Sequence, residues 1–552
     1  MADPRAARAA AFVALGAEPF DLLIVGGGIN GAGIARDAVL RGLRVAIVEQ
    51  GDFGSGTSSR SSKLIHGGLR YLEQGHIGLV LESVRERERL RRLAPHLVRP
   101  QRFFVPVYED GPVGFYKLAA GLWAYDLLAG WWSVHRHSML RARKASEAEP
   151  ALRSEGLRGA GVYWDCQTDD ARLVLETMLS AAGHGAVAVS YCRVAAFEKE
   201  ADRITGARVL DRLGGGQTVV RAKVVVNATG PWVDTMAALD APGPARLRLT
   251  KGVHIIVPRA RIGHRDAMVL NTVRDGRVMF IIPWGEHSLV GTTDTDHHGG
   301  PDTPPVTEPD DVAYLLETVN HYFPRAQLGP GDVVSTFAGL RPLVAPPPGT
   351  AENPSDTSRE EEILVSDSGL VSILGGKLTT YRLIAAKVVD RVADVLRQHG
   401  DSRHLGRSTT GKEPLVGGAT DPAVLAEIAI SRDGHGLAPA VVGHLAERYG
   451  SRLGEVLGLV GRDPKLGGPI VPELPDRRAE VVSAVEHEWA LTLEDVLRRR
   501  TRVALCDDTN GKVAATDVAN LMAAPLGWTS EAAHAAADAY ADIVDADRRR
   551  WR

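Results

Sequence analysis

The sequence has few cysteines, no excess of basic residues and no long uninterrupted hydrophobic run. Three widely spaced cysteines, Cys166, Cys192 and Cys506, argue against a disulfide framework or a cysteine-bound metal cluster and favour a reducing compartment. A net charge of -3 leaves no basic surplus to neutralise phosphates, so nucleic acid is not an expected partner. The composition, 44% hydrophobic and 24% charged in 552 residues, is typical of a soluble globular protein with several domains.

The segment most similar to a membrane span is GFYKLAAGLWAYDLLAGWW, residues 114–132. Lys117 and Asp126 interrupt it, which makes it a poor bilayer span. A buried helix is the favoured interpretation, and an amphipathic patch on a membrane surface is the alternative. Residues 1–20 lack the long apolar core of a signal peptide, and we expect them to form a flexible or helical extension.

A nucleotide-binding pattern occupies DLLIVGGGINGAGIARDAVLRGLRVAIVEQ, residues 21–50. It predicts a buried strand, a glycine turn, a helix and a second strand. Gly26 suits the tight turn, Gly28 lets the backbone approach a pyrophosphate, and Gly31 lets helix and strand pack closely. Glu49 ends the second strand, where an acid can accept a hydrogen bond from a ribose hydroxyl. A dinucleotide site is therefore expected, with phosphates at the helix N-terminus.

Two features favour FAD over NAD as the dinucleotide. The chain has no second strand–GxGxxG–helix unit that could form a separate nicotinamide domain. In addition, AKVVVNATG, residues 222–230, predicts a buried strand that ends in Ala228, Thr229 and Gly230. Such an ending is typical of flavoproteins in which a later strand returns to the FAD site.

Residues 57–74, TSSRSSKLIHGGLRYLEQ, concentrate hydroxyl groups, two adjacent glycines and Arg70. The hydroxyls and exposed backbone suit flavin phosphates and the ribityl chain. Gly67 and Gly68 allow the backbone to approach a flat ring without a Cβ in the way. Arg70 offers a planar donor fork for a carboxylate or phosphate.

His254 lies in LRLTKGVHIIVP, residues 247–258, at the start of an apolar strand. It could be structural, or it could accept an alcohol proton, because an imidazole titrates near ~6.5. Residues 271–296 then predict antiparallel strands that end in GTTDTD. Asp294 and Asp296 lack further ligands at a suitable spacing, so no metal is expected.

A second strand–glycine–helix junction follows at residues 370–392, with Lys377 after the glycines. Thr379 or Thr380 can cap the helix, whose N-terminus favours negative charge. A lysine at such a position can stabilise the charge that a flavin gains when it accepts a hydride. Arg341 and Arg359 lie upstream of this junction.

The order of these motifs resembles the FAD-dependent, respiratory glycerol-3-phosphate dehydrogenases over roughly residues 20–525. The resemblance rests on SSKLIHGGLRYLE (61–73), DCQTDDARLV (165–174), VNATGPWVD (226–234), KGVHIIVP (251–258), GTTDTD (291–296), AGLRPL (338–343) and GGKLTTYR (375–382).

The resemblance implies an α/β fold in which a Rossmann-like FAD-binding domain of the D-amino-acid-oxidase type is interwoven with a β-sheet substrate domain, followed by a helical C-terminal domain. After an extension at 1–20, the expected FAD-binding domain comprises 21–95, 155–245 and 335–395. The substrate-binding domain comprises 96–154 and 246–334, and the helical domain comprises 405–552. Apolar residues at helical spacing in the last region agree with this division.

The resemblance also implies oxidation of sn-glycerol 3-phosphate to dihydroxyacetone phosphate by hydride transfer from C2 to FAD N5, with membrane quinone as acceptor. His254, Arg341 and Lys377 would be catalytic, with His254 as the candidate base and Lys377 as the alternative. Arg359 stands in SREEE, where the family often has arginine followed by aspartate. The implied substrate-binding residues are Arg70, Tyr71, Arg341, Arg359, Lys377 and Thr380.

FAD is expected to be noncovalent, because no cysteine or histidine stands in an attachment motif. The implied cofactor-binding residues are Gly26, Gly28, Ile29, Asn30, Gly31, Glu49, Gln50, Thr57, Ser58, Ser62, Lys63, Leu64, His66, Gly67, Gly68, Ala228, Gly230, Gly376, Lys377, Leu378 and Thr379.

The expected location is cytoplasmic and peripheral on the inner face of the membrane, and a homodimer is compatible with the resemblance. Arg498, Arg499 and Arg500 and the tail DRRRWR, residues 547–552, predict a solvated helix face, with contact to anionic lipid as the alternative. Three other functions stay open: a glycerol-3-phosphate oxidase that uses O₂, an amine or amino-acid oxidase on the same fold, and a flavin-binding scaffold without turnover.

Overall fold

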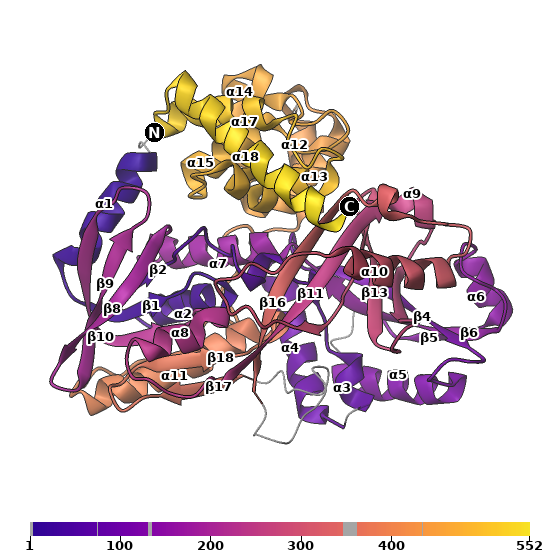
Figure 1. Ribbon diagram of the computed structural model, residues 1–552, viewed down its shortest axis with the longest axis horizontal. Helices are drawn as coiled ribbons and strands as arrows, with labels where there is room; N and C mark the ends of the chain where they lie inside the picture. Colours follow the sequence, from indigo (N-terminus) through magenta and orange to yellow (C-terminus); the bar gives the residue numbers. More distant parts are fainter. Residues whose placement is uncertain (1–3, 74, 131–134, 346–360, 433) are drawn as a thin grey trace.

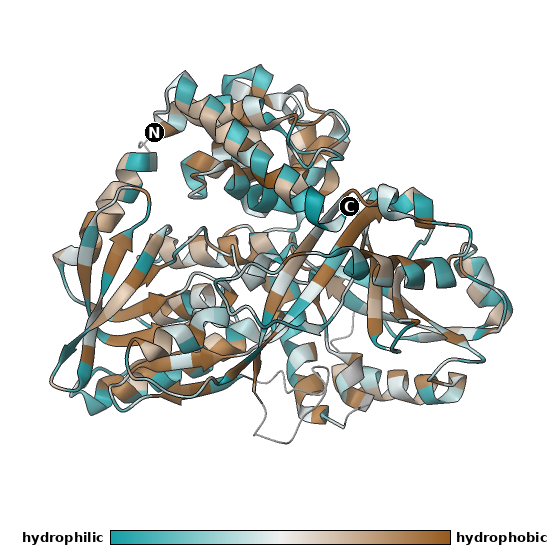
Figure 2. Cartoon of the chain, in the orientation of Figure 1, coloured by the Kyte–Doolittle hydropathy of each residue, from teal (hydrophilic) through white to brown (hydrophobic). Residues whose placement is uncertain are grey.

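The computed structural model describes residues 4–552 except 74, 131–134, 346–360 and 433, and it leaves out the side chains of Arg70 and Glu73. Two β-sheets lie side by side, and a cluster of helices from the C-terminal part of the chain lies above them (Figure 1). The strands of both sheets are predominantly hydrophobic (Figure 2). The fold is thus α/β with a separate helical domain, as the sequence predicts.

The first sheet has eight strands, and its central strands run parallel. The order β17-β18-β10-β1-β2-β7 is extended by β9 beside β10 and by β8 beside β9. Its strands are β1 (Phe20–Val25), β2 (Val45–Val48), β7 (Val187–Val189), β8 (Cys192–Glu200), β9 (Arg203–Asp211), β10 (Gln217–Asn227), β17 (Glu362–Val365) and β18 (Val371–Leu374).

Helices cover one face of this sheet, and the other face has a second core. Leu22 and Ile24 pack with helices α2 (Ile29–Leu40), α7 (Asp170–Gly183) and α11 (Tyr381–Gln398). Leu23, between them in sequence, packs on the opposite face with α1 (Pro4–Ala17) and the β8–β9 hairpin. Because a strand alternates with period 2 and both faces of this sheet are covered, residues 22–25 of β1 are all apolar.

The second sheet has ten strands in the order β15-β11-β14-β13-β12-β4-β6-β3, with β16 beside β11 and β5 beside β6. Its strands are β3 (Leu64–Ile65), β4 (Arg99–Tyr108), β5 (Ser138–Arg141), β6 (Leu157–Gln167), β11 (Leu247–Pro258), β12 (Ala267–Asn271), β13 (Val278–Trp284), β14 (His287–Gly291), β15 (Thr295–Asp296) and β16 (Ser335–Val344).

This sheet is also covered on both faces. Phe104 and the helix α10 (Pro309–Tyr322) belong to one core, whereas Phe103 and the helices α4 (Ile77–Leu93) and α5 (Phe115–Ala129) belong to the other. Short helices α3 (Leu69–Glu73), α6 (Ala142–Ala148), α8 (Val233–Ala238) and α9 (Arg259–Ile262) connect the elements of the two sheets.

The segments 155–245 and 335–395, which the sequence places in the FAD-binding domain, contribute strands to both sheets. Their strands β6 and β16 belong to the ten-stranded sheet, and their other strands belong to the eight-stranded sheet. β6 pairs antiparallel with β4 over almost its full length, and β16 does the same with β11. The antiparallel ladders join segments far apart in sequence, so no local composition change marks these transitions.

The helical C-terminal domain contains α12 (Pro422–Ser431), α13 (Pro439–Tyr449), α14 (Leu453–Arg462), α15 (Arg478–His487), α16 (Val503–Cys506), α17 (Ala515–Leu526) and α18 (Ser530–Trp551). The N-terminal residues 4–17 form helix α1, in agreement with the helical alternative. Arg5 of α1 donates a hydrogen bond from Nη1 to the carbonyl of Leu526 (2.9 Å), and Arg8 pairs with Asp211 (2.7 Å). Helix α1 thus links the first sheet to the C-terminal domain.

In the arginine run of the C-terminal domain, the side chains of Arg499 and Arg500 are only 10% and 1% exposed, whereas that of Arg498 is 27% exposed. The expectation of a solvated helix face is therefore wrong for Arg499 and Arg500. Arg500 is 1% exposed and donates to both carboxylate oxygens of Asp52, at 2.5 and 2.8 Å. Arg499 also donates to Asp52 (2.5 Å), and Arg498 donates to Asp547 (2.9 Å). The run therefore anchors the helical domain to the loop after β2, and Trp551 of the tail is buried in the core of the second sheet.

The apolar segment 114–132 contains helix α5, and only part of this helix is buried. The observed burial lies between the two interpretations, a buried helix and an amphipathic patch on a membrane surface. Leu118, Leu122 and Tyr125 are buried, whereas Trp123 and Leu127 are 65% and 83% exposed. Within the part of the chain that the structure describes, no helix combines the length and apolarity needed to cross a bilayer. Residues 131 and 132 of the segment lie outside the described residues.

Candidate active site

The glycine turn between β1 and α2 has no room for side chains. Gly26 has φ +106°, and a Cβ on Gly31 would lie 1.9 Å from the carbonyl oxygen of Gly26. Ala228, after β10, donates its N–H to the carbonyl of Val25 (2.9 Å). The strand that ends at Ala228 therefore returns to the glycine turn.

Glu49 is bound to the backbone of the same turn. Its carboxylate accepts hydrogen bonds from the N–H groups of Gly27 (2.7 Å) and Gly51 (2.8 Å). Burial raises the pKa of this carboxyl, and the two backbone bonds oppose that rise. Each oxygen keeps further acceptor capacity, so the geometry is compatible with a ribose hydroxyl as an additional donor.

Residues 57–68 form a segment, here named the bridging loop, that touches three other parts of the site. Thr57 donates to the carbonyl of Leu340 in β16 (2.6 Å), and Ser58 accepts from the N–H of Ile29 at the start of α2 (3.0 Å). Ser62 Oγ and His254 Nε2 are 2.9 Å apart. The loop thus brings the glycine turn together with both strands that carry candidate catalytic residues.

The far end of the bridging loop is tied to the second glycine junction. The N–H of His66 donates to Thr379 Oγ1 (3.1 Å), and that hydroxyl donates to the carbonyl of His66 (3.2 Å). Gly67 donates its N–H to Asp165 Oδ1 (3.1 Å), which also accepts from Arg87 (2.6 Å) and Tyr125 (2.9 Å). These bonds hold the two adjacent glycines in place.

A buried ion pair anchors the middle of the bridging loop. Lys63 Nζ lies 2.5 Å from Asp170 Oδ1, and the side chains are 3% and 0% exposed. The other oxygen of Asp170 accepts from the N–H (3.0 Å) and hydroxyl (2.7 Å) of Ser61. The Lys63 ammonium is therefore engaged by Asp170, while the Lys63 N–H donates to Ser61 Oγ (3.0 Å) and its carbonyl accepts from the N–H of Thr168 (2.9 Å).

His254 is a buried, neutral imidazole. It lies in β11 opposite Gly291 and Phe337, and its ring stacks on Phe337 with a centroid distance of 4.8 Å. Burial, followed by the charges of Arg341 and Lys63, holds the pKa of His254 well below its usual 6.5. The ring therefore keeps a free nitrogen lone pair at neutral pH, as a general base requires.

Arg341 is oriented by the GTTDTD loop. It pairs with Asp294 (2.8 Å), donates to Thr292 Oγ1 (2.8 Å) and donates to the carbonyl of Thr293 (3.1 Å). A Cβ on Gly252, in the neighbouring strand, would lie 2.4 Å from its guanidinium. Asp294 thus fixes the position of the Arg341 guanidinium.

Lys377 presents a buried ammonium beside the second glycine junction. Its Nζ lies 3.9 Å from the centroid of the Tyr71 ring and has no hydrogen-bond partner among the described residues. Asn30 Oδ1 is likewise buried without a partner, while its Nδ2 donates to the carbonyl of Gly375 (3.3 Å). The unpaired atoms Lys377 Nζ and Asn30 Oδ1, next to a glycine backbone that has no side chains, fit a ligand with both hydrogen-bond acceptors and donors. FAD is such a ligand.

The remaining predicted residues belong to the segments already described, namely the bridging loop, the ends of β2 and β10, and the second glycine junction. Gly68, Gly230 and Gly376 have positive φ values of 74°, 57° and 99°. Thr380 is 3% exposed at the start of α11. The side chain of Arg70 and the whole of Arg359 lie outside the described residues. The others are Gln50 after β2, Leu64 in β3 and Leu378 in the 3₁₀ turn before α11.

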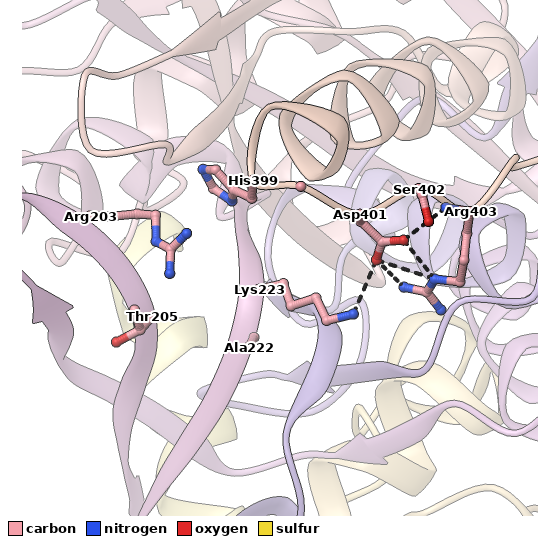
Figure 3. Close-up of a pocket in the computed structure, with 9 residues that line it drawn as sticks. Arg203, Thr205, Ala222, Lys223, His399, Asp401, Ser402 and Arg403 are labelled. Carbon is pink, nitrogen blue, oxygen red and sulfur yellow. Dashed lines mark hydrogen bonds and ion pairs between the residues drawn. The ribbon is translucent and has the colours of Figure 1, made fainter.

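A separate surface pocket lies at the opposite end of the first sheet. It has a volume of about 450 Å³ and is lined by Arg203, Lys223 and His399, with Asp401 paired to Lys223 (3.0 Å) and Arg403 (2.6 Å) (Figure 3). Ligands of parallel sheets bind at the carboxyl ends of the strands. This pocket adjoins the amino-terminal end of β1, so it is distinct from the candidate active site.

Comparisons with known families agree with this geometry. Residues 21–382 match the model of the FAD dependent oxidoreductases, and residues 408–533 match the C-terminal domain of alpha-glycerophosphate oxidase. A glycerol-3-phosphate dehydrogenase of Mycobacterium leprae is 42% identical over 526 residues, which cover 95% of this chain and 88% of that protein. The chain belongs to the FAD-dependent glycerol-3-phosphate dehydrogenase family. This assignment confirms FAD as the cofactor of the family and the resemblance found in the sequence.

Other members of the dehydrogenase family and its fold relatives give the same result. The aerobic glycerol-3-phosphate dehydrogenase of Staphylococcus aureus is 37% identical, with 88% of this chain and 87% of that protein covered. The glycerol-3-phosphate dehydrogenase of Bacillus halodurans, solved with FAD, has a TM-score of 0.79 at 32% identity and covers 98% of this chain and 97% of its own. The L-alpha-glycerophosphate oxidase of Mycoplasma pneumoniae shares the fold, with a TM-score of 0.55 at 19% identity, covering 72% of this chain and 99% of its own.

Sequence reasoning missed the carboxylates that position the site in this family member. Asp165 and Asp170 lie in DCQTDDARLV, which carried the resemblance without a role for either acid. In the sequence alone, Asp294 stands out only as a candidate metal ligand. DCQTDDARLV and GTTDTD are both rich in polar residues, so no local signal distinguishes the acids that bind a buried cation.

We predict that Asp170→Asn destabilises the protein and weakens flavin retention. The change leaves the Lys63 ammonium buried without a counter-ion, and breaking such a pair typically costs about 3–5 kcal/mol. Urea unfolding would measure the stability, and the flavin-to-protein absorbance ratio after gel filtration would measure retention.

The matched control is Asp394→Asn on helix α11. Asp394 pairs with Arg397, but the two side chains are 43% and 63% exposed, so the expected loss is below about 1 kcal/mol. Equal effects of the two variants on both measurements would contradict the anchoring role of Asp170.

Proposed function

We propose that this chain oxidises sn-glycerol 3-phosphate to dihydroxyacetone phosphate and passes the electrons to a membrane quinone. The observation that carries the proposal is the grouping of a neutral buried base, His254, with the cations Arg341 and Lys377 around the bridging loop. Two cations suit a phosphate, and a neutral imidazole suits an alcohol proton. The names of the curated relatives support the same substrate.

The cations hold the substrate and set its orientation. Arg341 supplies positive charge for a phosphate, while Asp294 and Thr292 bind its guanidinium and fix its position. Lys377 and the N-terminal end of α11 add positive charge at the second glycine junction. Positive charge fixed there stabilises negative charge that develops in the transition state without a reorganisation cost.

His254 receives the proton of the C2 hydroxyl at an imidazole nitrogen. Ser62, bonded to Nε2, and the stacked Phe337 ring fix the orientation of the imidazole. The positive charges of Arg341 and Lys63 disfavour a protonated His254. The imidazole must therefore release the proton to another acceptor after the reaction. The glycine turn before α2 and the second glycine junction would hold FAD noncovalently, and FAD would supply the hydride acceptor.

One observation favours a second candidate, a glycerol-3-phosphate oxidase. The family model matched by residues 408–533 is described for alpha-glycerophosphate oxidase, so the domain itself is compatible with O₂ as acceptor. The insertion that oxidases tend to carry is absent from the sequence, which supports the dehydrogenase.

We expect sn-glycerol 3-phosphate to bleach the visible flavin absorbance of the purified protein under anaerobic conditions. Arg341→Gln should lower the second-order rate of bleaching by roughly 10- to 150-fold, because a charge-assisted hydrogen bond contributes about 1.5–3 kcal/mol. Arg248→Gln is the control, since Arg248 lies in the adjacent strand and pairs with Asp296 instead (2.7 Å).

The same sample distinguishes the candidates. Recovery of the absorbance with a soluble quinone, but only slowly in air, supports the dehydrogenase, and rapid recovery in air supports the oxidase. A flavin that stays oxidised with glycerol 3-phosphate, and is bleached by an amine or amino acid, would overturn the substrate assignment.

The pH dependence of flavin reduction tests the base. Because the pKa of His254 is held well below 6.5, protonation of this ring begins only in more acidic solution. The rate of reduction should therefore stay level as the pH falls from 7.5 to about 6, and then decrease. His254→Gln should lower the rate and remove this acid limb, whereas a midpoint near 6.5 in the unaltered protein would argue against a neutral buried His254.

We further propose that the exposed face of α5 rests on the membrane surface. Tyr116, Trp123 and Leu127 are 83%, 65% and 83% exposed, and their spacings of seven and four residues place them on one face of the helix. Exposed aromatic and aliphatic side chains on a helix are typical of interfacial anchoring. Contact there would bring the chain to the phase that holds the quinone.

The double variant Trp123→Ser/Leu127→Ser should reduce binding to vesicles that contain phosphatidylglycerol by at least about tenfold, since each buried side chain contributes about 1.5–3 kcal/mol. Sedimentation with vesicles measures the binding. Val513→Ser, which alters an 80% exposed valine of the C-terminal domain, is the control. Unchanged binding of the double variant would exclude α5 as the contact.

A further inference from the structure

The two ring nitrogens of His254 have different surroundings. Nε2 lies 2.9 Å from Ser62 Oγ, whereas Nδ1 is buried and has no hydrogen-bond partner among the described residues. Gly291 lies opposite His254 in β14, and a Cβ there would be 2.3 Å from Cδ2 and 2.9 Å from Nε2 of the ring. The Cδ2–Nε2 edge of the imidazole therefore faces β14 and the bridging loop, and Nδ1 lies on the opposite side of the ring.

The charged groups around the ring keep it neutral. Burial, followed by the charges of Arg341 from β16 and Lys63 from the bridging loop, holds the pKa of His254 well below 6.5. These two cations are themselves paired, Arg341 with Asp294 and Lys63 with Asp170. At neutral pH the imidazole thus has one N–H group and one nitrogen lone pair, and the position of its single proton decides which nitrogen can act as a base.

The hydroxyl of Ser62 determines where that proton is best placed. With the proton on Nε2, the N–H donates to Ser62 Oγ and only a lone pair is left at Nδ1. With the proton on Nδ1, a buried N–H donor would have no acceptor in the described part of the chain. Because buried polar N–H groups are almost always hydrogen-bonded, the arrangement favours the form with the proton on Nε2.

A second buried histidine, which also contacts a serine, has the opposite arrangement. His264 Nε2 lies 2.6 Å from Ser288 Oγ, but its Nδ1 lies 2.7 Å from the carbonyl oxygen of Asp266. A carbonyl oxygen only accepts, so the proton of neutral His264 is on Nδ1 and Nε2 accepts from Ser288. No carbonyl is bonded to Nδ1 of His254, and this difference leaves its lone pair available to a bound alcohol.

The backbone on both sides of Ser62 is held in place. Ser61 donates from its N–H (3.0 Å) and its hydroxyl (2.7 Å) to Asp170. The carbonyl of Lys63 accepts from the N–H of Thr168 (2.9 Å). The hydroxyl between these two anchored residues is therefore directed at the imidazole before any substrate binds, as a preorganised site requires.

We propose that Ser62 is a positioning residue that holds the proton of His254 on Nε2 and so makes Nδ1 the atom that accepts the C2 proton. The proposal rests on the proposed function. The O–H bond at C2 breaks as an N–H bond forms from the lone pair of Nδ1, and the hydride lost from C2 goes to the flavin. After the product leaves, the Nδ1 proton passes to water, and Nε2–H stays bonded to Ser62 throughout.

The direct test is ¹⁵N NMR of the FAD-loaded protein labelled with ¹⁵N-histidine, at pH 7.5 and without substrate. A ring nitrogen with a proton and one with a lone pair have well-separated shifts, and the signals of His254 are those that His254→Gln removes. We expect the proton on Nε2 in His254 and on Nδ1 in His264. A proton on Nδ1 of His254 would overturn the proposal.

Ser62→Ala should shift the ring signals of His254 and slow flavin reduction by sn-glycerol 3-phosphate. The limiting rate per bound flavin should fall by roughly 2- to 13-fold, the factor that corresponds to one neutral hydrogen bond. The substrate concentration that gives half of this rate should not change, because Ser62 acts on the base and not on the phosphate. Ser62→Thr keeps the hydroxyl and should retain both the signals and the rate.

The matched control is Ser288→Ala, which removes the serine–histidine hydrogen bond at His264, outside the candidate active site. It should leave the signals of His254 and the rate unchanged. A loss of rate in Ser62→Ala without a change in the His254 signals would overturn the proposal, because it would show that Ser62 is merely structural. If the unaltered protein does not reduce its flavin with glycerol 3-phosphate, the proposed function fails, and the ¹⁵N signals still decide where the proton of His254 lies.

Discussion

The buried carboxylate of Asp170 is the contact on which the arrangement of the active site depends. It neutralises Lys63 and fixes the backbone of Ser61, so the bridging loop is held at its centre. The ends of that loop reach β16 and the second glycine junction, and Ser62 reaches His254. Because Asp170 opens helix α7, which packs beneath the first sheet, the position of His254 is set by the nucleotide-binding fold itself.

Three other carboxylates hold loops in place around the site in the same way. Asp165 binds Arg87 and the N–H of Gly67, Asp294 binds Arg341, and Asp52 binds Arg499 and Arg500. Each joins a loop to an element from a distant part of the chain. A buried ion pair adds little net stability compared with apolar packing, but losing one partner is costly. Their common effect is therefore geometric, because they restrict each loop to one position and give the site the preorganisation that electrostatic catalysis needs.

The local motifs could be predicted from the sequence, whereas the partners of those motifs could not. The glycine turn, β10 and the junction at Lys377 are set by short-range constraints: positive φ, close approach and helix capping. The pairing of β6 with β4, and of β16 with β11, joins segments far apart in the chain, and apolar strands of either sheet have the same composition. Arg499 and Arg500 resemble a solvated helix face in the sequence, because their partner Asp52 is more than 400 residues earlier. Arg70 and Arg359 remain predictions.

Asp52 also connects the C-terminal domain to the nucleotide end of the site. The loop after Glu49 packs on the glycine turn, since Gly51 donates to Glu49 and Gly54 donates to the carbonyl of Gly27. Asp52 lies between these two contacts in the sequence and accepts a hydrogen bond from Arg500, which is itself 1% exposed. A displacement of the helical domain must therefore either strip a buried carboxylate of its counter-ions or move the loop that holds the glycine turn. Both are costly, and this explains why a domain without predicted active-site residues belongs to the structure of the flavin site.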